Sequence, residues 1–300
     1  MTFRCGTVAV IGKPNVGKST IINHLIGEKI SITSPRPQTT RDTFAAILND
    51  KNSQIILYDT PGIHQPKTKF GKMLVQNALK MLDECDVILF VVDVSKMPNI
   101  EDKQIAKHIK QANKKIVVAL NKMDRLKPEF VQMHYDAYEK LVNNPHMMYT
   151  NALTGENIEK LKQLIKDVLP ESDPLYPIDD YITTQSLRQM ASEIIREKVL
   201  LQTREEIPHS ISVRIDFWEE DSLDDGSPIT KIQSTIFVER ESQKPIMIGK
   251  QGRMLKTIGT QARQEIEELI GQKAYLGLTV KVREKWRDTP SKWREMGIPH

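Results

Sequence analysis

The stretch "GKPNVGKS", residues 12–19, decides the fold of the first half of the chain. It has the spacing G-x-x-x-x-G-K-[ST], and it lies between an apolar run, "TVAVI", and a helical pattern, "STIINHLIG". Glycines in this context let the backbone point its N–H groups at a phosphate, and the helix N-terminus adds positive charge. We expect Lys18 to reach the terminal phosphates of a nucleotide and the hydroxyl of Ser19 to bind Mg²⁺.

Two further motifs each follow an apolar run. "DTPG", residues 59–62, ends the run "QIILY", and "NKMD", residues 121–124, ends the run "KIVVAL". Asp59 can hold Mg²⁺ through water, and the N–H of Gly62 can sense a γ-phosphate. The carboxylate of Asp124 can accept hydrogen bonds from the N1–H and 2-amino groups of guanine, whereas adenine would leave it unpaired. We expect the methylene stem of Lys122 to lie over the base and the amide of Asn121 to join the loops.

Short runs rich in Val and Ile alternate with helical patterns from residue 7 to residue 169. This alternation predicts an α/β domain with a mostly parallel sheet and helices on both faces. "TFAAILN", residues 43–49, is separated from residues 54–59 by the turn cluster "DKNS". We therefore expect a hairpin with one antiparallel strand at the edge.

The second half of the chain has a different pattern. Prolines interrupt residues 169–186, and a helix, two alternating strands, a loop, a helix (260–270) and a strand then follow. This order predicts an α+β module with helices on one face of a small sheet. We expect a first domain over residues 1–169, a linker over 170–185, and a second domain with a C-terminal tail over 186–300.

A second glycine loop, "IGKQGR", lies at residues 248–253. Only two residues separate its glycines and no Lys-Ser/Thr pair follows, so it is not a second nucleotide loop. It matches the G-x-x-G loop of a KH module, and α-β-β-loop-α-β is the type II KH order. Such loops clamp the backbone of single-stranded nucleic acid, with basic side chains adding charge. The expected RNA-binding residues are Ile248, Gly249, Lys250, Gln251, Gly252 and Arg253.

Composition agrees with a two-domain globular protein. The chain has 300 residues, 39% of them hydrophobic, a net charge of +4 and only two cysteines. The start lacks a secretory pattern and the apolar runs have only strand length, so we expect a soluble protein of the reducing cytosol. Residues 244–300 hold twelve Lys/Arg against six Asp/Glu, which makes this end locally basic.

Residues 1–169 resemble the translation-factor class of P-loop GTPases, with the motifs in family order. The resemblance implies that a threonine of "PQTTRD", residues 37–42, closes over Mg²⁺ and the γ-phosphate, and we favour Thr40 over Thr39. It also implies a backbone N–H from Ala152 to the guanine O6, although Asn151 stands where the family has serine. The nucleotide-binding residues it implies are Gly12, Lys13, Pro14, Asn15, Val16, Gly17, Lys18, Ser19, Thr20, Asp59, Thr60, Pro61, Gly62, Ile63, Asn121, Lys122, Met123, Asp124, Asn151, Ala152 and Leu153, with Mg²⁺ on Ser19, Thr40 and Asp59.

Ile63 occupies the position where many GTPases have the glutamine that orients the attacking water. His64 and Gln65 are neighbouring alternatives for this role. In this class, the branch with a hydrophobic residue here often has an asparagine in the first loop that helps hold a monovalent cation, and Asn15 matches it. The resemblance thus implies slow, K⁺-stimulated hydrolysis with Lys18, Thr40, Gly62 and Asn15 as catalytic residues.

Nearly the whole chain resembles the Era family, the bacterial KH-domain GTPases of small-subunit ribosome assembly. The resemblance rests on "KPNVGKST", "QTTRD", "DTPG", "KPIMIGKQG" and "VKVREKWR". It implies a cytoplasmic monomer that binds GTP and GDP, the 3′ end of 16S ribosomal RNA and the 30S subunit, and that also associates peripherally with the membrane. The alternative is a membrane-associated regulatory switch of cell cycle or energy metabolism whose KH fold binds other partners. Trp286 and Trp293 fit either packing of the tail or base stacking.

Overall fold

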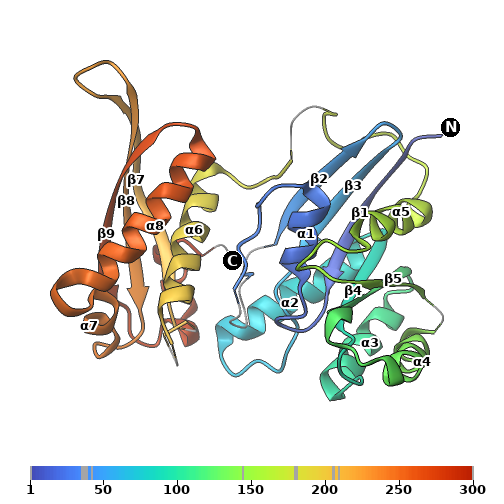
Figure 1. Cartoon of the computed structure of the whole chain (residues 1–300). Coiled ribbons are helices and arrows are strands. Elements are labelled where there is room, and N and C mark those ends of the chain that lie inside the picture. The colour runs from blue at the N-terminus through green and yellow to red at the C-terminus, as the bar shows by residue number, and fades with distance from the viewer. Residues whose placement is uncertain are drawn as a thin grey trace. The chain divides into compact units, whose positions relative to one another are not determined.

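The computed structural model describes residues 2–34, 40–41, 43–143, 145–178, 182–204, 207–208 and 210–298. The chain divides into two compact units (Figure 1). The first comprises Met1–Lys67 and Lys72–Thr184, and the second comprises Thr68–Gly71 and Gln185–His300.

The first unit contains a six-stranded sheet with the order β2-β3-β1-β4-β5-β6. The pairing of β2 with β3 is antiparallel, and every other pairing is parallel. The predicted mostly parallel sheet with an antiparallel hairpin at its edge is therefore confirmed. The strands are β1 (Arg4–Ile11), β2 (Phe44–Asp50), β3 (Ser53–Asp59), β4 (Val87–Asp93), β5 (Lys115–Asn121) and β6 (His146–Thr150).

Helices cover both faces of this sheet, because its buried strands are apolar on both sides. Ala9 and Ile11 of β1 join one core cluster with α2, α3 and α4, whereas α1 packs with α5, β2 and β3. The helices are α1 (Lys18–Ile26), α2 (Lys69–Glu84), α3 (Ile100–Gln111), α4 (Val131–Val142) and α5 (Ile158–Val168), with 3₁₀ turns at Met123–Arg125 and Pro128–Phe130.

The proline-rich segment after α5 packs along the hairpin of the first unit. The side-chain oxygen of Gln54 accepts hydrogen bonds from the backbone N–H groups of Leu175 (2.8 Å) and Tyr176 (2.9 Å). Further along, the N–H of Ile47 donates to the carbonyl of Ile182 (2.8 Å). The described residues between 170 and 184 are therefore grouped with the first unit, while the limits 1–169, 170–185 and 186–300 for domains and linker stay a prediction.

The second unit contains a three-stranded sheet with the order β7-β8-β9, in which β8 runs antiparallel to β7 and parallel to β9. Helices α6 and α8 pack against each other, α6 contacts β7, and α8 contacts β9. The elements are α6 (Leu187–Gln202), β7 (Ser212–Ser222), β8 (Pro228–Val238), α7 (Gln243–Ile248), α8 (Arg253–Ile270) and β9 (Lys273–Val282), with 3₁₀ turns at Lys250–Gly252, Trp286–Asp288, Pro290–Lys292 and Arg294–Met296.

Two details of this unit differ from the sequence prediction. Helix α8 begins at Arg253, seven residues before the predicted start at residue 260, and α7 forms where no helix was expected. Gly259 weakens the helical pattern locally, but burial of Ile258, Ala262 and Ile266 on one face outweighs this low propensity.

The tail tryptophans are packed inside the second unit. The ring of Trp286 is fully buried and its Nε1 donates to the carbonyl of Ser210 at 3.0 Å. Trp293 is also buried, and its Nε1 donates to the carbonyl of Trp286 at 2.8 Å. These contacts support packing rather than base stacking for both rings.

In the part of the chain that the structure describes, no helix combines the length and the apolar character needed to span a membrane.

Candidate nucleotide site and nucleic-acid interface

The loop between β1 and α1 can be formed only with glycine at two positions. A Cβ on Gly12 would lie 2.3 Å from the carbonyl oxygen of Val91. Gly17 has a φ of 104°, and a Cβ there would lie 2.2 Å from the side-chain nitrogen of Asn121. Gly17 is also the N-cap of α1 and has no side chain with which to cap it, so the first N–H groups of α1 face the loop. This is the geometry that suits an anion at a helix N-terminus.

Lys18 is buried inside this loop, with only 6% of its surface exposed. Its Nζ donates to the backbone carbonyls of Lys13 (3.1 Å) and Gly12 (3.3 Å). Burial lowers the pKa of the Lys18 ammonium to about 8, and the nearby charge of Asp59 opposes this shift. The ammonium is therefore held by weak neutral acceptors at the position where phosphate oxygens are expected.

Three oxygen-bearing side chains meet beside Lys18. The Oγ of Ser19 lies 3.0 Å from Asp59 Oδ2 and 3.1 Å from the Oγ1 of Thr40, which in turn lies 3.2 Å from Asp59 Oδ2. The other oxygen of Asp59 is buried without a hydrogen-bond partner among the described residues. Burial raises the pKa of the Asp59 carboxyl, against the charge of Lys18 and the hydroxyl hydrogen bonds.

These oxygens fit a hard cation. Mg²⁺ takes oxygen ligands and is usually bound by one or two protein groups, phosphates and water. Among the described residues there is no group of three or more His, Cys, Asp or Glu side chains that could hold a metal ion. Of the predicted alternatives, Thr40 lies at this site, whereas Thr39 lies outside the described residues, as do residues 35–38 and 42.

The "DTPG" segment packs directly on the phosphate loop. The N–H of Ile63 donates to the carbonyl of Gly12 at 3.0 Å, and a Cβ on Gly62 would lie 2.7 Å from the backbone nitrogen of Pro14. The Ile63 side chain joins the core. The Nδ1 of His64 lies 2.9 Å from the carbonyl of Gly62.

The expected base site joins three loops through one side chain. The amide of Asn121 donates from Nδ2 to the carbonyl of Val16 (2.7 Å), and its Oδ1 accepts from the N–H of Ala152 (2.9 Å). The N–H of Ala152 that was predicted to bind the guanine O6 is thus used inside the protein. Asn151, in place of the family serine, accepts from the N–H of Leu153 at 3.1 Å.

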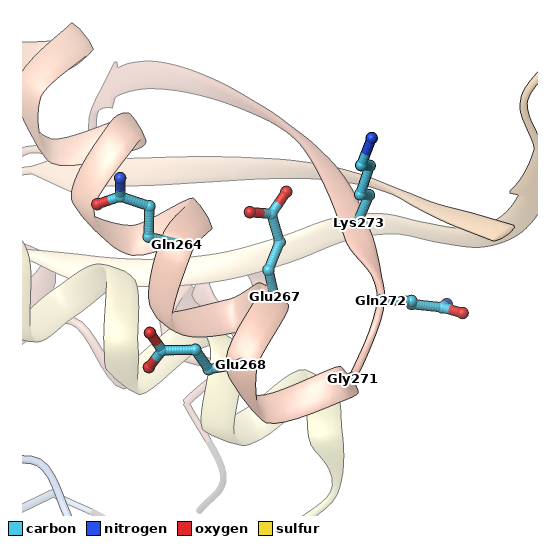
Figure 2. Close-up of a pocket in the computed structure, with 6 residues that line it drawn as sticks. All are labelled: Gln264, Glu267, Glu268, Gly271, Gln272 and Lys273. Carbon is cyan, nitrogen blue, oxygen red and sulfur yellow. The ribbon is translucent and has the colours of Figure 1, made fainter. Parts of the chain in front are cut away.

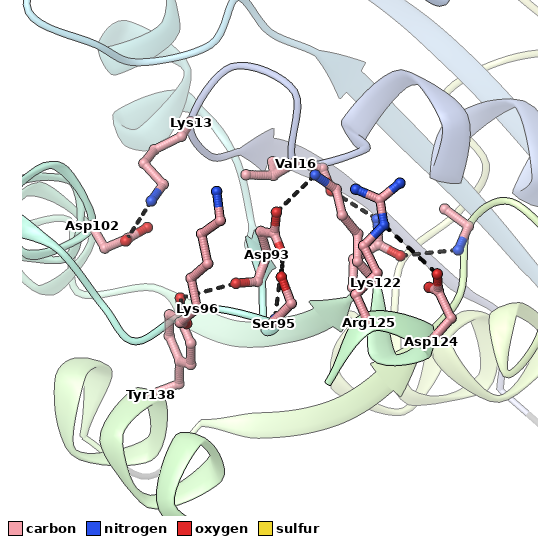
Figure 3. A network of polar contacts seen from close by, with 12 residues as sticks. Lys13, Val16, Asp93, Ser95, Lys96, Asp102, Lys122, Asp124, Arg125 and Tyr138 are labelled. Atoms are coloured by element: carbon pink, nitrogen blue, oxygen red, sulfur yellow. Dashed lines mark hydrogen bonds and ion pairs between the residues drawn. The ribbon is translucent and has the colours of Figure 1, made fainter. Parts of the chain in front are cut away.

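The base loop is shaped by Lys122, which has a φ of 65°. Its Nζ pairs with Asp93 Oδ2 at 2.8 Å (Figure 3). Asp124 lies beside Arg125 at 3.8 Å and stays partly exposed, so its carboxylate is accessible to a base. The structure therefore brings together the residues predicted for the phosphate loop (12–20), for the segment 59–63, called the switch segment below, and for the base site, while their roles stay predictions.

The "IGKQGR" loop is a tight turn between α7 and α8. Gly249 has φ 75° and ψ 171°, and Gly252 has φ 75° and ψ 8°, so both lie where L side chains are strained. A Cβ on Gly249 would also lie 2.7 Å from the Cβ of Met254. Gly252 is the N-cap of α8 and offers it no side-chain cap, so the loop presents backbone N–H groups together with Lys250 and Arg253.

A groove of about 310 Å³ continues from this loop between α8 and β9. The groove residues beyond Arg253 were not predicted from the sequence. The spacing of three or four residues along a helix from Gly252 could have identified those in α8, whereas nothing in the sequence marks Leu276 and Leu278 of β9. The groove is lined by Gly252, Leu255, Lys256, Gly259, Thr260, Arg263, Leu276 and Leu278.

Beyond the groove, an open hollow surrounds the C-terminal end of α8 (Figure 2). Glu267 pairs there with Arg263 at 2.8 Å and accepts from the N–H of Ala274 at 3.0 Å. The second of these contacts fastens the end of α8 to β9. The hollow is lined by Gln264, Glu267, Glu268, Gly271, Gln272 and Lys273.

Comparisons with known proteins agree with both parts of this geometry. Residues 7–122 match the family model of the 50S ribosome-binding GTPases, and residues 206–287 match the KH domain. The chain is 43% identical to GTPase Era of Alkaliphilus oremlandii over 297 residues, which covers 99% of both chains. It is 44% identical to GTPase Era of Heliobacterium modesticaldum, covering 99% of this chain and 97% of the relative.

Solved structures give the same result. A crystal structure of Era in complex with MgGDPNP and nucleotides 1506–1542 of 16S ribosomal RNA matches with a TM-score of 0.93 and 42% identity, covering 98% of this chain and 99% of the other. A structure of an Era variant from Aquifex aeolicus bound to GDP.AlF4- matches with a TM-score of 0.92 and 41% identity, with the same coverage. The chain therefore belongs to the Era family of GTPases.

Proposed function

We propose that this GTPase binds the 3′ end of 16S ribosomal RNA and acts, through cycles of GTP binding and hydrolysis, in rRNA processing and assembly of the 30S subunit. The observation that carries the proposal is the full-length likeness, at 42% identity, to an Era structure that holds both MgGDPNP and a 16S rRNA fragment. Two loops of the described structure support the proposal as well. One unit has the loop expected to bind the nucleotide, and the other has the glycine loop expected to bind the RNA backbone.

When the nucleotide binds, the Lys18 ammonium exchanges its two backbone carbonyl partners for phosphate oxygens, and the carboxylate of Asp124 selects guanine. Ser19, Thr40 and Asp59 would hold Mg²⁺, which neutralises charge on the phosphates when bound. We assign the N–H of Gly62 as a donor to the γ-phosphate, and the close approach of Gly62 to Pro14 of the loop supports this assignment. We assign Asn151, Ala152 and Leu153 to the guanine pocket.

In the RNA half, the turn at Gly249–Gly252 lets the backbone of the strand approach closely, and the groove along α8 receives its bases. Lys250, Lys256 and Arg263 supply positive charge for the phosphates. Ile248 and Arg253 flank the turn at its two ends.

The RNA proposal is tested with an oligonucleotide of the 16S 3′ end and a scrambled RNA of the same composition, in filter binding at several salt concentrations. The expected result is at least roughly tenfold tighter binding of the ribosomal sequence, about 1.4 kcal/mol. Turnover of GTP, measured with and without the fragment, is expected to change because coupled sites influence each other. Equal affinity for both RNAs would overturn the specific-site assignment and leave only backbone binding.

We further propose that K⁺ assists hydrolysis, with Asn15 contributing to its site. Asn15 lies in the phosphate loop and adopts a φ of 60°. The Ile63 side chain is buried in the core, so Ile63 cannot orient the attacking water. A cation against the phosphates would neutralise developing charge as an arginine finger does. At saturating GTP we expect turnover about tenfold faster in KCl than in NaCl, a difference of roughly 1.4 kcal/mol in the barrier. Equal rates in the two salts contradict this assignment.

Ribosome assembly makes the cytoplasm the expected place of action. Function as a monomer and peripheral association with the membrane stay predictions that rest on the family resemblance.

A further inference from the structure

The connection from the end of β4 to the start of α3, residues 93–102, carries two carboxylates that each pair with a lysine of a nucleotide loop (Figure 3). Asp93 Oδ2 lies 2.8 Å from the Nζ of Lys122 in the base loop. Asp102 Oδ2 lies 2.6 Å from the Nζ of Lys13 in the phosphate loop. One short segment thus contacts both loops.

This connection is itself held firmly. The hydroxyl of Tyr138 in α4 donates to the carbonyls of Lys96 (3.1 Å) and Asp93 (3.4 Å). The Nδ1 of His134, one turn earlier, donates to the carbonyl of Val94 at 2.6 Å. The connection therefore provides a rigid support rather than a free surface loop.

Asp102 is far more buried than a helix cap requires. Its side chain is 1% exposed, and that of Lys13 is 14% exposed. Asp102 Oδ2 accepts the N–H of Asn99 at 3.0 Å, which completes the capping box of α3, but Oδ1 has no hydrogen-bond partner within the described part of the chain. A neutral side chain could complete the same cap, whereas a buried carboxylate is costly unless a cation pairs with it. The ion pair with Lys13 is the feature that accounts for the charge.

Lys13 lies in the half of the loop that meets the switch segment. Its carbonyl accepts from Lys18, and the next residue, Pro14, is the one that Gly62 touches. The carbonyl of the preceding residue, Gly12, accepts from Ile63. Residues 12–14 are therefore contacted by the switch through their backbone and by α3 through one side chain.

We propose that Asp102 is a positioning residue for the phosphate loop: by pairing with Lys13 it holds residues 12–14 in the conformation that receives the β-phosphate. Asp93 has the corresponding effect on the base loop through Lys122. The inference rests on the nucleotide half of the proposed function. It predicts that Asp102 affects binding of the β-phosphate, whereas Asp93 affects binding of the guanine base.

The test compares the affinities of full-length variants for GDP and GMP, measured by competition with a fluorescent GDP analogue. Asp102→Asn keeps an acceptor for the N–H of Asn99 and removes only the charge. We expect its GDP affinity to fall roughly tenfold and its GMP affinity to change less than about twofold, so the ratio of the two affinities falls. Asp93→Asn should weaken GDP and GMP in the same proportion, because both contain guanosine. A general loss of folded protein would leave the ratio of GDP to GMP affinity unchanged in both variants.

Three further variants complete the test. Lys13→Met breaks the same pair, and combining it with Asp102→Asn should cost no more than the larger single change, because interacting residues are not additive. Lys13→Arg keeps a positive charge to pair with Asp102, so its ratio of GDP to GMP affinity should equal that of the unmodified protein. Asp50→Asn is a matched control, since the 2.8 Å pair of Asp50 with Lys166 lies at the opposite end of the strands, and it should leave both affinities unchanged.

An unchanged GDP-to-GMP ratio in Asp102→Asn, or additive effects with Lys13→Met, would overturn the positioning role. Failure of the unmodified protein to bind GDP would instead overturn the proposed nucleotide function, so the two failures are distinguishable.

Discussion

Replacing Gly62 by alanine is expected to slow GTP hydrolysis by a factor of about 100 or more, the usual effect of losing a preorganised donor to developing charge. The added Cβ would lie 2.7 Å from the backbone nitrogen and 2.8 Å from the Cα of Pro14. Neither atom can move freely, because Gly12 and Lys13 on the same loop are hydrogen-bonded to Ile63, Lys18 and Asp102. The switch segment must therefore shift away from the γ-phosphate.

Single-turnover hydrolysis of GTP measures this loss, and GDP affinity separates it from a binding defect. GDP has no γ-phosphate, so its affinity should stay within about threefold of the unmodified protein, a change of roughly 0.65 kcal/mol. Gly27→Ala is the matched control: Gly27 ends α1 with a φ of 84°, and a Cβ there would meet no described atom within 4 Å. It should cost about 1 kcal/mol of stability and leave hydrolysis unchanged. A normal hydrolysis rate in Gly62→Ala would refute the role of this close contact.

Replacing Gly249 by alanine is expected to lower affinity for the 16S 3′ fragment by about two orders of magnitude, roughly 2.7 kcal/mol. Two independent obstacles act at this position. Its φ of 75° with ψ of 171° belongs to a region that is almost restricted to glycine. The Cβ would also lie 2.7 Å from the Cβ and 2.8 Å from the backbone nitrogen of Met254 in α8. The turn must open, so the loop loses the shape that clamps the strand.

Gly252→Ala provides the comparison within the same loop. Gly252 has a left-handed conformation, but a Cβ there would meet no described atom within 4 Å. Strain of about 1 kcal/mol predicts a loss of roughly fivefold in RNA affinity. Filter binding measures both variants, and GTP affinity should be unchanged in each because the nucleotide loops belong to the other unit. If Gly252→Ala is as damaging as Gly249→Ala, close approach of RNA at Gly252, and not the shape of the turn, limits binding.

Much of the nucleotide site could be predicted because its motifs are local. The spacing of Gly12, Gly17 and Lys18 marks the phosphate loop within a few residues, and alternating apolar runs place the ends of β1, β3 and β5 at one edge of a parallel sheet. The same reasoning failed at the start of α8. There, burial of one helix face against the rest of the unit outweighs the weak local propensity around Gly259.

The groove beside the second glycine loop shows the limit of local patterns. Gly249 and Gly252 were identified from their spacing, but Leu276 and Leu278 were not, since nothing in the chain marks which strand lies beside α8. Only the parallel pairing of β8 with β9 brings them to the groove.

The amino-acid sequence was sufficient to determine the two modules, their order, and the positions of the two glycine loops, because each of these is marked by a pattern within a short stretch. Tertiary structure alone decided which acids pair with Lys13 of the phosphate loop and with Lys122 of the base loop. Asp102 is 89 residues from Lys13 in the chain, and no spacing rule connects them. Their pairing depends on the packing of α3 beside the loop, which buries the carboxylate of Asp102 where the ammonium of Lys13 compensates its charge.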